Sequence, residues 1–271
     1  ASMGIGILNA KQVVVSNNTI REMGVQRTLG GTMTMTTSDE GTVGVYALNS
    51  QQLNITGNQI NKMYSKAAGV SVGIRVLITQ AGAGAGASTY EWRGYNISDN
   101  IVDNDPVTVS VLGDVCRIRG IEVLCINSDD TYNHNLQEVR VANNTISHLM
   151  SYAHSGIVST GIYLRAWTTN AATNRAALRD TVVTGNQINM VEGFGIFAES
   201  TDYLGGDALS MQLLSISGNT VNRMAETFGV ADTAGICVAV AEEANVRGVK
   251  IDGNFLHKVY NNGIWLRPSG E

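Results

Sequence analysis

The sequence predicts an all-β fold, a right-handed parallel β-helix (solenoid) of about seven to eight coils with long inserted loops. Two observations lead to this prediction. A Gly-Ile or Gly-Val pair recurs along the chain, and an asparagine recurs between each pair and the next. Such repeats are typical of solenoids, in which each repeat buries its apolar face against its neighbours. We therefore interpret residues 1–271 as a single β-helix domain, either complete or a fragment of a longer chain.

The glycine pairs mark one strand in each coil. Because side chains alternate along a strand, the residues two and four places after the glycine share its outer face. Equivalent residues of successive coils then stack about 4.8 Å apart. The pairs are Gly4-Ile5, Gly44-Val45, Gly73-Ile74, Gly120-Ile121, Gly161-Ile162, Gly195-Ile196, Gly235-Ile236 and Gly263-Ile264.

The recurring asparagine marks a turn. Alternating apolar residues precede it, as Val13 and Val15 do in the first coil, so one face of the preceding strand is buried. The residue directly before it is always Asn, Gly or Asp, the types that accept a positive φ. Stacked coils then predict an internal ladder of amide hydrogen bonds. Its members are Asn18, Asn58, Asn100, Asn144, Asn186, Asn219 and Asn254.

The spacing separates a minimal coil from its insertions. The shortest glycine-to-asparagine gap is 14 residues and the shortest asparagine-to-glycine gap is 9, which gives a coil of 23. Three short strands and three turns fit that length. Longer gaps predict loops on both margins of the Gly-Ile strand, at about 79–93, 126–137, 166–180 and 200–212 on one side and 24–43, 64–72, 105–119, 150–160 and 225–234 on the other.

With this repeat, residues 4–267 resemble the pectate-lyase-like superfamily of right-handed parallel β-helices. The resemblance implies coils of similar length with a buried asparagine ladder, and a groove between loops that holds an extended polysaccharide. The superfamily includes polysaccharide lyases and hydrolases, sugar epimerases, phage tailspikes and non-catalytic surface proteins, so it does not select an activity. It favours an extracellular or virion-associated location.

Composition excludes several classes of partner. The net charge of −5 comes without a long charged run, so no nucleic-acid footprint is expected. No apolar run approaches the ~20 residues of a membrane span. Cys116, Cys125 and Cys237 are odd in number and lie in dissimilar contexts, which predicts free thiols rather than disulfides or a metal site.

Two outer columns of the Gly-Ile strand carry the candidate chemistry. Two places after the glycine they read Gly6, Tyr46, Arg75, Glu122, Tyr163, Phe197, Cys237 and Trp265. Four places after it they read Leu8, Leu48, Leu77, Leu124, Arg165, Glu199, Ala239 and Arg267. The face is therefore leucine-striped in the first four coils and aromatic and charged beyond them.

Aromatic rings stack on sugars, and arginine pairs with uronate groups. We therefore assign substrate binding to Arg75, Tyr163, Trp167, Phe197, Trp265 and Arg267. The candidate catalytic set is Glu122 and Glu199, with Arg165 between them. Their α-carbons are expected on the order of 12 Å apart, and long side chains bring the carboxyls within the ~6.5 to 9.5 Å of an inverting hydrolase. The alternative interpretation is two surface glutamates paired with arginines.

No cofactor is expected. Asp99, Asp103 and Asp105 flank one asparagine turn and carry the oxygen ligands that Ca²⁺ takes, but a solvated turn explains them as well. The four histidines lack metal-ligand or triad spacing.

Two functions follow from these patterns. One is a protein that binds or degrades polysaccharide in a groove on the Gly-Ile face, with its status as an enzyme left open. The alternative is a non-catalytic structural or adhesive scaffold that assembles through its faces or ends. A homo-oligomer or a neighbouring domain is expected to cover the open coil ends, because they present unpaired strand edges.

Overall fold

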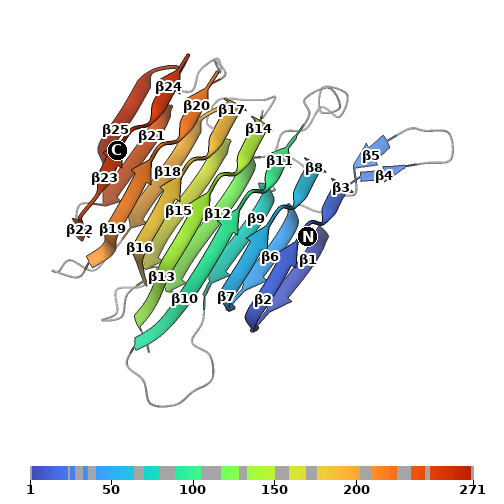
Figure 1. Cartoon of the computed structure of the whole chain (residues 1–271), viewed down its shortest axis with the longest axis horizontal. Coiled ribbons are helices and arrows are strands. Elements are labelled where there is room, and N and C mark those ends of the chain that lie inside the picture. Colours follow the sequence, from blue (N-terminus) through green and yellow to red (C-terminus); the bar gives the residue numbers. More distant parts are fainter. Residues whose placement is uncertain are drawn as a thin grey trace.

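Three stacked sheets of parallel strands form the protein (Figure 1). The computed structural model describes residues 2–23, 25–27, 33–35, 41–63, 70–79, 89–104, 117–127, 133–149, 159–168, 176–201, 209–224, 233–241 and 245–269. Every regular element in these ranges is a strand, and each sheet takes one strand from each successive coil. The predicted parallel β-helix is confirmed.

The sheets are named first, second and third in chain order. The first sheet contains β1 (Ser2–Leu8), β6 (Thr42–Leu48), β9 (Val70–Ile78), β12 (Arg117–Asn127), β15 (Thr160–Thr168), β18 (Phe194–Thr201), β21 (Ala234–Ala241) and β25 (Asn262–Ser269). The second contains β2 (Lys11–Ser16), β7 (Gln51–Thr56), β10 (Thr89–Ser98), β13 (Asn133–Ala142), β16 (Ala176–Thr184) and β19 (Leu209–Ser217), followed by β22 (Asn245–Arg247) and β23 (Lys250–Asp252), which both pair with β19.

The third sheet contains β3 (Thr19–Met23), β8 (Gln59–Met63), β11 (Ile101–Asp103), β14 (Thr145–Leu149), β17 (Gln187–Val191), β20 (Thr220–Asn222) and β24 (Phe255–His257). A small antiparallel hairpin, β4 (Val25–Arg27) with β5 (Met33–Met35), projects beside β3 (Figure 1). The described part of the chain holds no helix long and apolar enough to cross a membrane.

All the Gly-Ile pairs lie in the first sheet, and close stacking of the coils explains the glycine. A Cβ built on Gly161 would lie 2.5 Å from the carbonyl oxygen of Gly195 and 2.9 Å from Cγ2 of Ile188. Real Cβ atoms do not approach other atoms so closely. Any larger residue at a position of this column that has a coil stacked above it would force the two coils apart.

The asparagine turn joins the second sheet to the third and has the predicted conformation. The preceding residue has a positive φ in all seven coils, from 55° at Asn143 to 66° at Gly57 and Gly185. Asn144 shows how the ladder is built. Its Nδ2 donates to Oδ1 of Asn186 at 2.9 Å and to the carbonyl of Ile97 at 2.9 Å, while its backbone N–H donates to the same Oδ1 at 3.0 Å. The same bond between side-chain amides links each ladder residue to the next, from Asn18 to Asn254.

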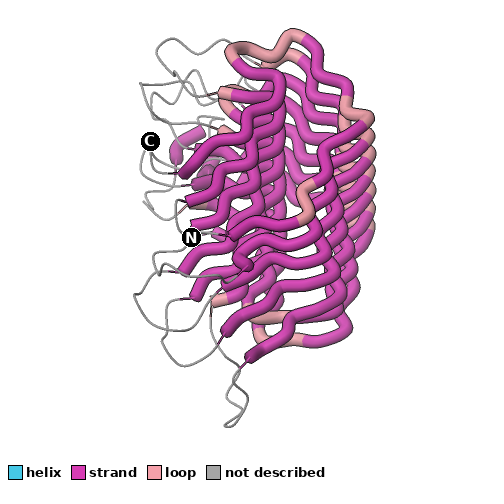
Figure 2. Tube along the Cα trace, turned by 90° about the vertical axis from the view of Figure 1, so that its left-hand side faces the viewer, coloured by secondary structure: helices cyan, strands magenta, loops and turns pink. Residues whose placement is uncertain are grey.

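The core fills the space between the three sheets with stacked aliphatic side chains. Ile74, Ile121, Ile162, Ile196 and Ile236 form one fully buried column directly after the glycines. Figure 2 shows the coils stacked with their strands side by side, so each residue packs against its equivalents above and below. Burial of such columns is the main favourable contribution to folding.

Two cysteines of this fold are buried thiols, as predicted. Burial raises the pKa of Cys125 to about 12, and Cys237, in the outer column of the first sheet, is also buried in a cluster against which Phe197 and Trp265 pack. Cys116 lies outside the described residues.

The strands are longer than the spacing predicted. Residues 89–93, 133–137, 176–180 and 209–212 belong to strands of the second sheet rather than to loops. The remaining parts of the expected loops, such as 80–88, 128–132, 169–175 and 202–208, lie outside the described residues. The second sheet also bends once per coil at a residue with positive φ, an unpredicted feature found at Gln12, Gln52, Gly94, Glu138, Asp180, Leu213 and Gly248.

Candidate functional site

The outer face of the first sheet has the predicted register. Glu122 of β12 pairs with Arg75 of β9 on one side and with Tyr163 of β15 on the other. In the second column, Arg165 lies between Leu124 and Glu199. Both columns therefore stack coil upon coil as the sequence predicted, and Glu122 and Glu199 lie two coils apart.

A hollow of about 280 Å³ opens on this face over β12, β15 and β18. We call it the arginine hollow. Its lining combines three guanidinium groups, three aromatic rings, one carboxylate and one hydroxyl, from Arg117, Arg119, Thr160, Tyr163, Arg165, Phe194, Phe197 and Glu199. Cations therefore outnumber anions at its wall, and the aromatic rings supply apolar surface.

A buried carboxylate supports one wall of the arginine hollow. Glu122 has no exposed surface, and its two oxygens form ion pairs with Arg75 and Arg119. Arg119 in turn lies over the ring of Tyr163, with its guanidinium carbon 4.0 Å from the ring centroid. Glu122 thus holds Arg119 in place between a carboxylate and an aromatic face.

A second carboxylate supports the opposite wall. The hydroxyl of Tyr163 donates to Oε2 of Glu199 at 2.6 Å, and Nε of Arg165 lies 3.2 Å from the same oxygen. Burial, followed by the charge of Glu199, raises the pKa of Tyr163, so the phenol stays protonated and remains a donor. Arg165 also lies over the ring of Trp167 at 4.2 Å.

Aromatic contacts complete the surface. Phe194 and Phe197 stack with their ring centroids 4.6 Å apart, and Phe197 lies 5.4 Å from Tyr163. Two coils further on, Arg267 of β25 lies over Trp265 at 4.4 Å. Arginine paired with an aromatic face therefore occurs repeatedly along the charged part of the sheet.

Arg117 differs from the other arginines of the hollow. It is exposed, and no carboxylate within the described ranges pairs with it. With Glu122 and Glu199 already bound to other arginines, Arg117 leaves the arginine hollow with a positive charge available to an anion.

The structure brings part of the predicted site together. Tyr163, Arg165, Phe197 and Glu199 all line the arginine hollow. Of the other predicted residues, Glu122 and Arg75 form an ion pair beside it, Trp167 stacks on Arg165, and Trp265 and Arg267 lie on β25. The catalytic roles assigned to Glu122, Glu199 and Arg165 stay predictions.

Arg117, Arg119, Thr160 and Phe194 line the hollow but were not predicted. Counting every second residue from the glycine misses them. The pairing of neighbouring strands is interrupted at that glycine, so residues before it and after it do not follow one continuous in-and-out alternation. Arg119 and Glu122 consequently share a face although they are three residues apart. Their position in the repeat could have identified three of them, because Arg119, Thr160 and Phe194 each directly precede the glycine of their coil.

The four leucines of the outer column, which we call the leucine stripe, become less exposed from the first coil to the fourth. Leu8 is 57% exposed, Leu48 and Leu77 are half-buried, and Leu124 is buried. The stripe is therefore most accessible at the first coil.

Asp103, one of the three aspartates considered for Ca²⁺, is engaged by side chains of β14. Oδ1 of Asp103 contacts His148 Nδ1 at 2.7 Å and accepts from Ser147 Oγ at 2.9 Å. Asp99 occupies the turn with a φ of 59°, and Asp105 lies outside the described residues. Across the described segments, no three acidic, histidine or cysteine side chains form a group suited to a metal ion.

The chain was compared with protein-family models, with curated proteins and with solved structures, and it matches none of them. Its function is therefore inferred from the geometry of the outer face.

Proposed function

We propose that the outer face of the first sheet binds an acidic polysaccharide, with a carboxylate-bearing sugar in the arginine hollow. The observation that carries this proposal is the combination of three arginines and three aromatic rings around one hollow of about 280 Å³. Neither feature alone selects this ligand. A cationic surface binds any polyanion and an aromatic surface binds any apolar ring, whereas a uronate sugar presents a carboxylate and flat C–H faces together.

The proposed contacts follow from the groups that remain available. Arg117 pairs with the sugar carboxylate, because its guanidinium is the exposed one and arginine matches carboxylate geometry. Phe197, which is half-buried and stacks on the buried ring of Phe194, forms the stacking surface for the sugar ring. Trp265 and Arg267 lie further along the same face, where a longer polymer would reach them.

The proposal concerns binding rather than cleavage. A pair of acids that hydrolyses a glycosidic bond must reach the bond from both sides. Glu199 reaches the hollow, whereas Glu122 has no exposed surface and both of its oxygens are engaged. We therefore assign Glu122 to positioning Arg119. The resemblance to the pectate-lyase-like superfamily agrees with this ligand class.

Titration calorimetry with polygalacturonate and with a neutral galactan of matched length tests the proposal. We expect binding of the acidic polymer only, weakening as salt is added. Arg117→Ala should weaken binding about tenfold or more, the effect of losing a hydrogen bond to a charged group. Arg165→Ala should also weaken binding, because it leaves the negative charge of Glu199 in the hollow without its arginine. Arg21→Ala is the matched control, because Arg21 is exposed on the third sheet.

Equal binding of the neutral polymer, or unchanged binding by both hollow variants, would contradict the proposal. Assays for unsaturated products and for reducing ends on the same samples distinguish binding from lyase or hydrolase activity.

A further inference from the structure

We propose that the second sheet carries a separate binding site for a linear acidic polysaccharide in which charged and neutral sugars alternate. The observation behind this proposal is a column of the second sheet in which cationic residues and glutamines alternate from coil to coil. We call it the cation–glutamine column, and its members in chain order are Lys11, Gln51, Arg93, Gln137, Arg179, Gln212 and Arg247. It lies on a different sheet from the arginine hollow, so the inference goes beyond the proposed function.

Strand pairing places these residues in one row. Lys11 pairs with Gln51, and each residue from Arg93 to Arg247 pairs with the next. Gln51 and Arg93 join the two parts, because they directly precede the stacked bend residues Gln52 and Gly94. A Cβ on Gly94 would lie 3.5 Å from Cα of Gln52. Since neighbouring strands lie about 4.8 Å apart, the cations recur about every 9.6 Å.

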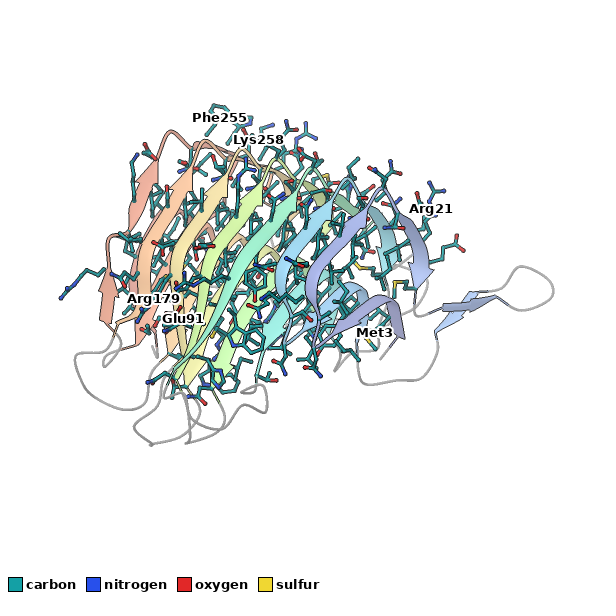
Figure 3. The ribbon with its side chains drawn as sticks, turned by 60° about the horizontal axis from the view of Figure 1, so that its bottom comes forward. Met3, Arg21, Glu91, Arg179, Phe255 and Lys258 are labelled. Atoms are coloured by element: carbon teal, nitrogen blue, oxygen red, sulfur yellow. The ribbon has the colours of Figure 1, made fainter. Side chains whose placement is uncertain are left out.

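The column faces outward. The residues directly before its middle members belong to the hydrophobic core, and they are Trp92, Leu136, Leu178 and Met211. The cations are exposed except for Arg179, which is half-buried, and the glutamines between them are half-buried or buried. Figure 3 labels Arg179 of this column and Glu91, which lies on β10 two residues before Arg93. The positive groups therefore stand out from a row of amides.

The glutamines are informative because glutamate has nearly the same shape and would stabilise the column. Opposite charges on neighbouring strands attract, and like charges repel. Repulsion explains why cations do not occupy consecutive coils, but it does not explain why all three intervening residues are neutral. In the first sheet, by contrast, Glu122 pairs with Arg75 and Arg119 and neutralises them. The cation–glutamine column instead leaves its cations available to an external anion.

Carboxylates near the column reduce this positive charge without removing it. Glu91 pairs with Arg93, but the two side chains are 44% and 49% exposed, and exposed ion pairs contribute little. Glu138 and Asp180 occupy the bend directly after the column. Among the described residues neither of them forms an ion pair with the column, and Nε of Arg179 is buried without a hydrogen-bond partner.

The spacing of the cations selects the ligand. An extended polysaccharide advances by roughly one coil spacing per sugar, so a carboxylate on every second sugar matches the column. Arginine binds such a carboxylate through paired hydrogen bonds, and glutamine amides bind the hydroxyls of the neutral sugar between. A carboxylate on that intervening sugar would approach Glu138, which directly follows Gln137. Duplex DNA, with a charge about every 1.7 Å of its axis, does not match this spacing.

Titration calorimetry with hyaluronate, in which glucuronate alternates with N-acetylglucosamine, tests the proposal. All titrations use an Arg117→Ala background, so that the arginine hollow contributes little. We expect hyaluronate to bind this protein and polygalacturonate to bind it more weakly. Arg93→Gln should weaken hyaluronate binding about tenfold, the effect of losing a hydrogen bond to a charged group. Arg21→Gln is the matched control, because it removes the same charge from an exposed position on the third sheet.

A double variant that conserves charge tests the spacing itself. Arg179→Gln with Gln212→Arg moves one cation by one coil and keeps the composition and net charge. We expect hyaluronate binding to weaken about tenfold, whereas attraction to net charge alone would leave it unchanged. Urea unfolding shows whether the double variant folds, and Arg93→Gln, at an exposed position, tests the column in either case.

Absence of hyaluronate binding in the Arg117→Ala background would overturn the proposal. So would unchanged binding by Arg93→Gln or by the folded double variant, or polygalacturonate binding as tight as that of hyaluronate. Failure of the proposed function is recognised separately, as equal binding of polygalacturonate by the wild type and by Arg117→Ala.

Discussion

The asparagine turn and the outer face of the first sheet differ in how much they vary from coil to coil. The turn repeats one residue type in seven coils, while the outer column changes from Tyr46 to Arg75 to Glu122 to Tyr163. Asn144 and its neighbours in the ladder are fully buried and bond to one another. A residue that must match its own copy above and below cannot vary, whereas a residue that faces solvent can. Repetition therefore indicates architecture in this solenoid, and the variable column marks the surface to which we assign the proposed ligand.

The glycine column should give the largest effect on stability. Gly161→Ala places a Cβ 2.5 Å from a backbone carbonyl, which cannot move without displacing a coil. We expect a loss of about 4 kcal/mol in the free energy of unfolding, at the upper end for overpacking. Urea unfolding measures it. Gly263→Ala in dilute solution is the matched control, with an expected change within about 0.5 kcal/mol. Equal losses at both positions would mean that coil stacking does not require the glycine.

Substitution in the asparagine ladder should give the next largest loss of stability. Asn144→Leu removes the acceptor of the Asn100 N–H groups and the donor to the carbonyl of Ile97, all buried. We expect a loss of about 3 kcal/mol, because unsatisfied buried groups cost about 1 to 3 kcal/mol each. The adjacent Asn143→Gly keeps the positive φ and should change little in the same urea titration. A neutral Asn144→Leu variant would show that the ladder does not stabilise the fold.

Glu122 distinguishes the two regions most sharply, because it belongs to the variable column yet is buried. Glu122→Ala leaves Arg75 and Arg119 without their carboxylate, and we expect a loss of about 3 kcal/mol, the lower end for a broken buried ion pair because both arginines keep some contact with solvent. Glu138→Ala, on the exposed surface of the second sheet, should be nearly neutral. If Glu122→Ala instead kept wild-type stability and abolished a polysaccharide cleavage seen in the wild type, the catalytic role would replace the positioning role.

Raising the pH should have the smallest effect on the stability of the fold. Burial raises the pKa of Cys125 from 9.0 to about 12, and burial with the charge of Glu199 raises that of Tyr163. Both groups lose their protons more readily in the unfolded chain. Their contribution to the free energy of unfolding is therefore complete below about pH 9 and is lost as pH rises toward 12. Urea midpoints should agree between pH 7 and pH 8 and fall modestly at pH 10.5. Cys125→Ala should reduce that fall, and an unchanged pH dependence would exclude the thiol as its source.

The repeat made most of the architecture predictable. The three sheets, the left-handed residue before each asparagine, the ladder and both outer columns follow from spacing and residue type, because identical residues meet at each level. Arg117, Arg119 and Phe194 were missed because alternation does not reveal the change of phase at the glycine. The burial of Glu122 depends on which side chains close over it, and the bends at Gln12 or Leu213 use residues with no preference for a positive φ.

A crystal structure of the chain soaked with trigalacturonate is the most direct test of the central claim, that the variable outer face binds the ligand. We predict a sugar ring against Phe197, with its carboxylate within about 3 Å of Arg117, the range of a charge-assisted hydrogen bond. A sugar bound on the second or third sheet, or an empty arginine hollow at saturating ligand, would contradict it.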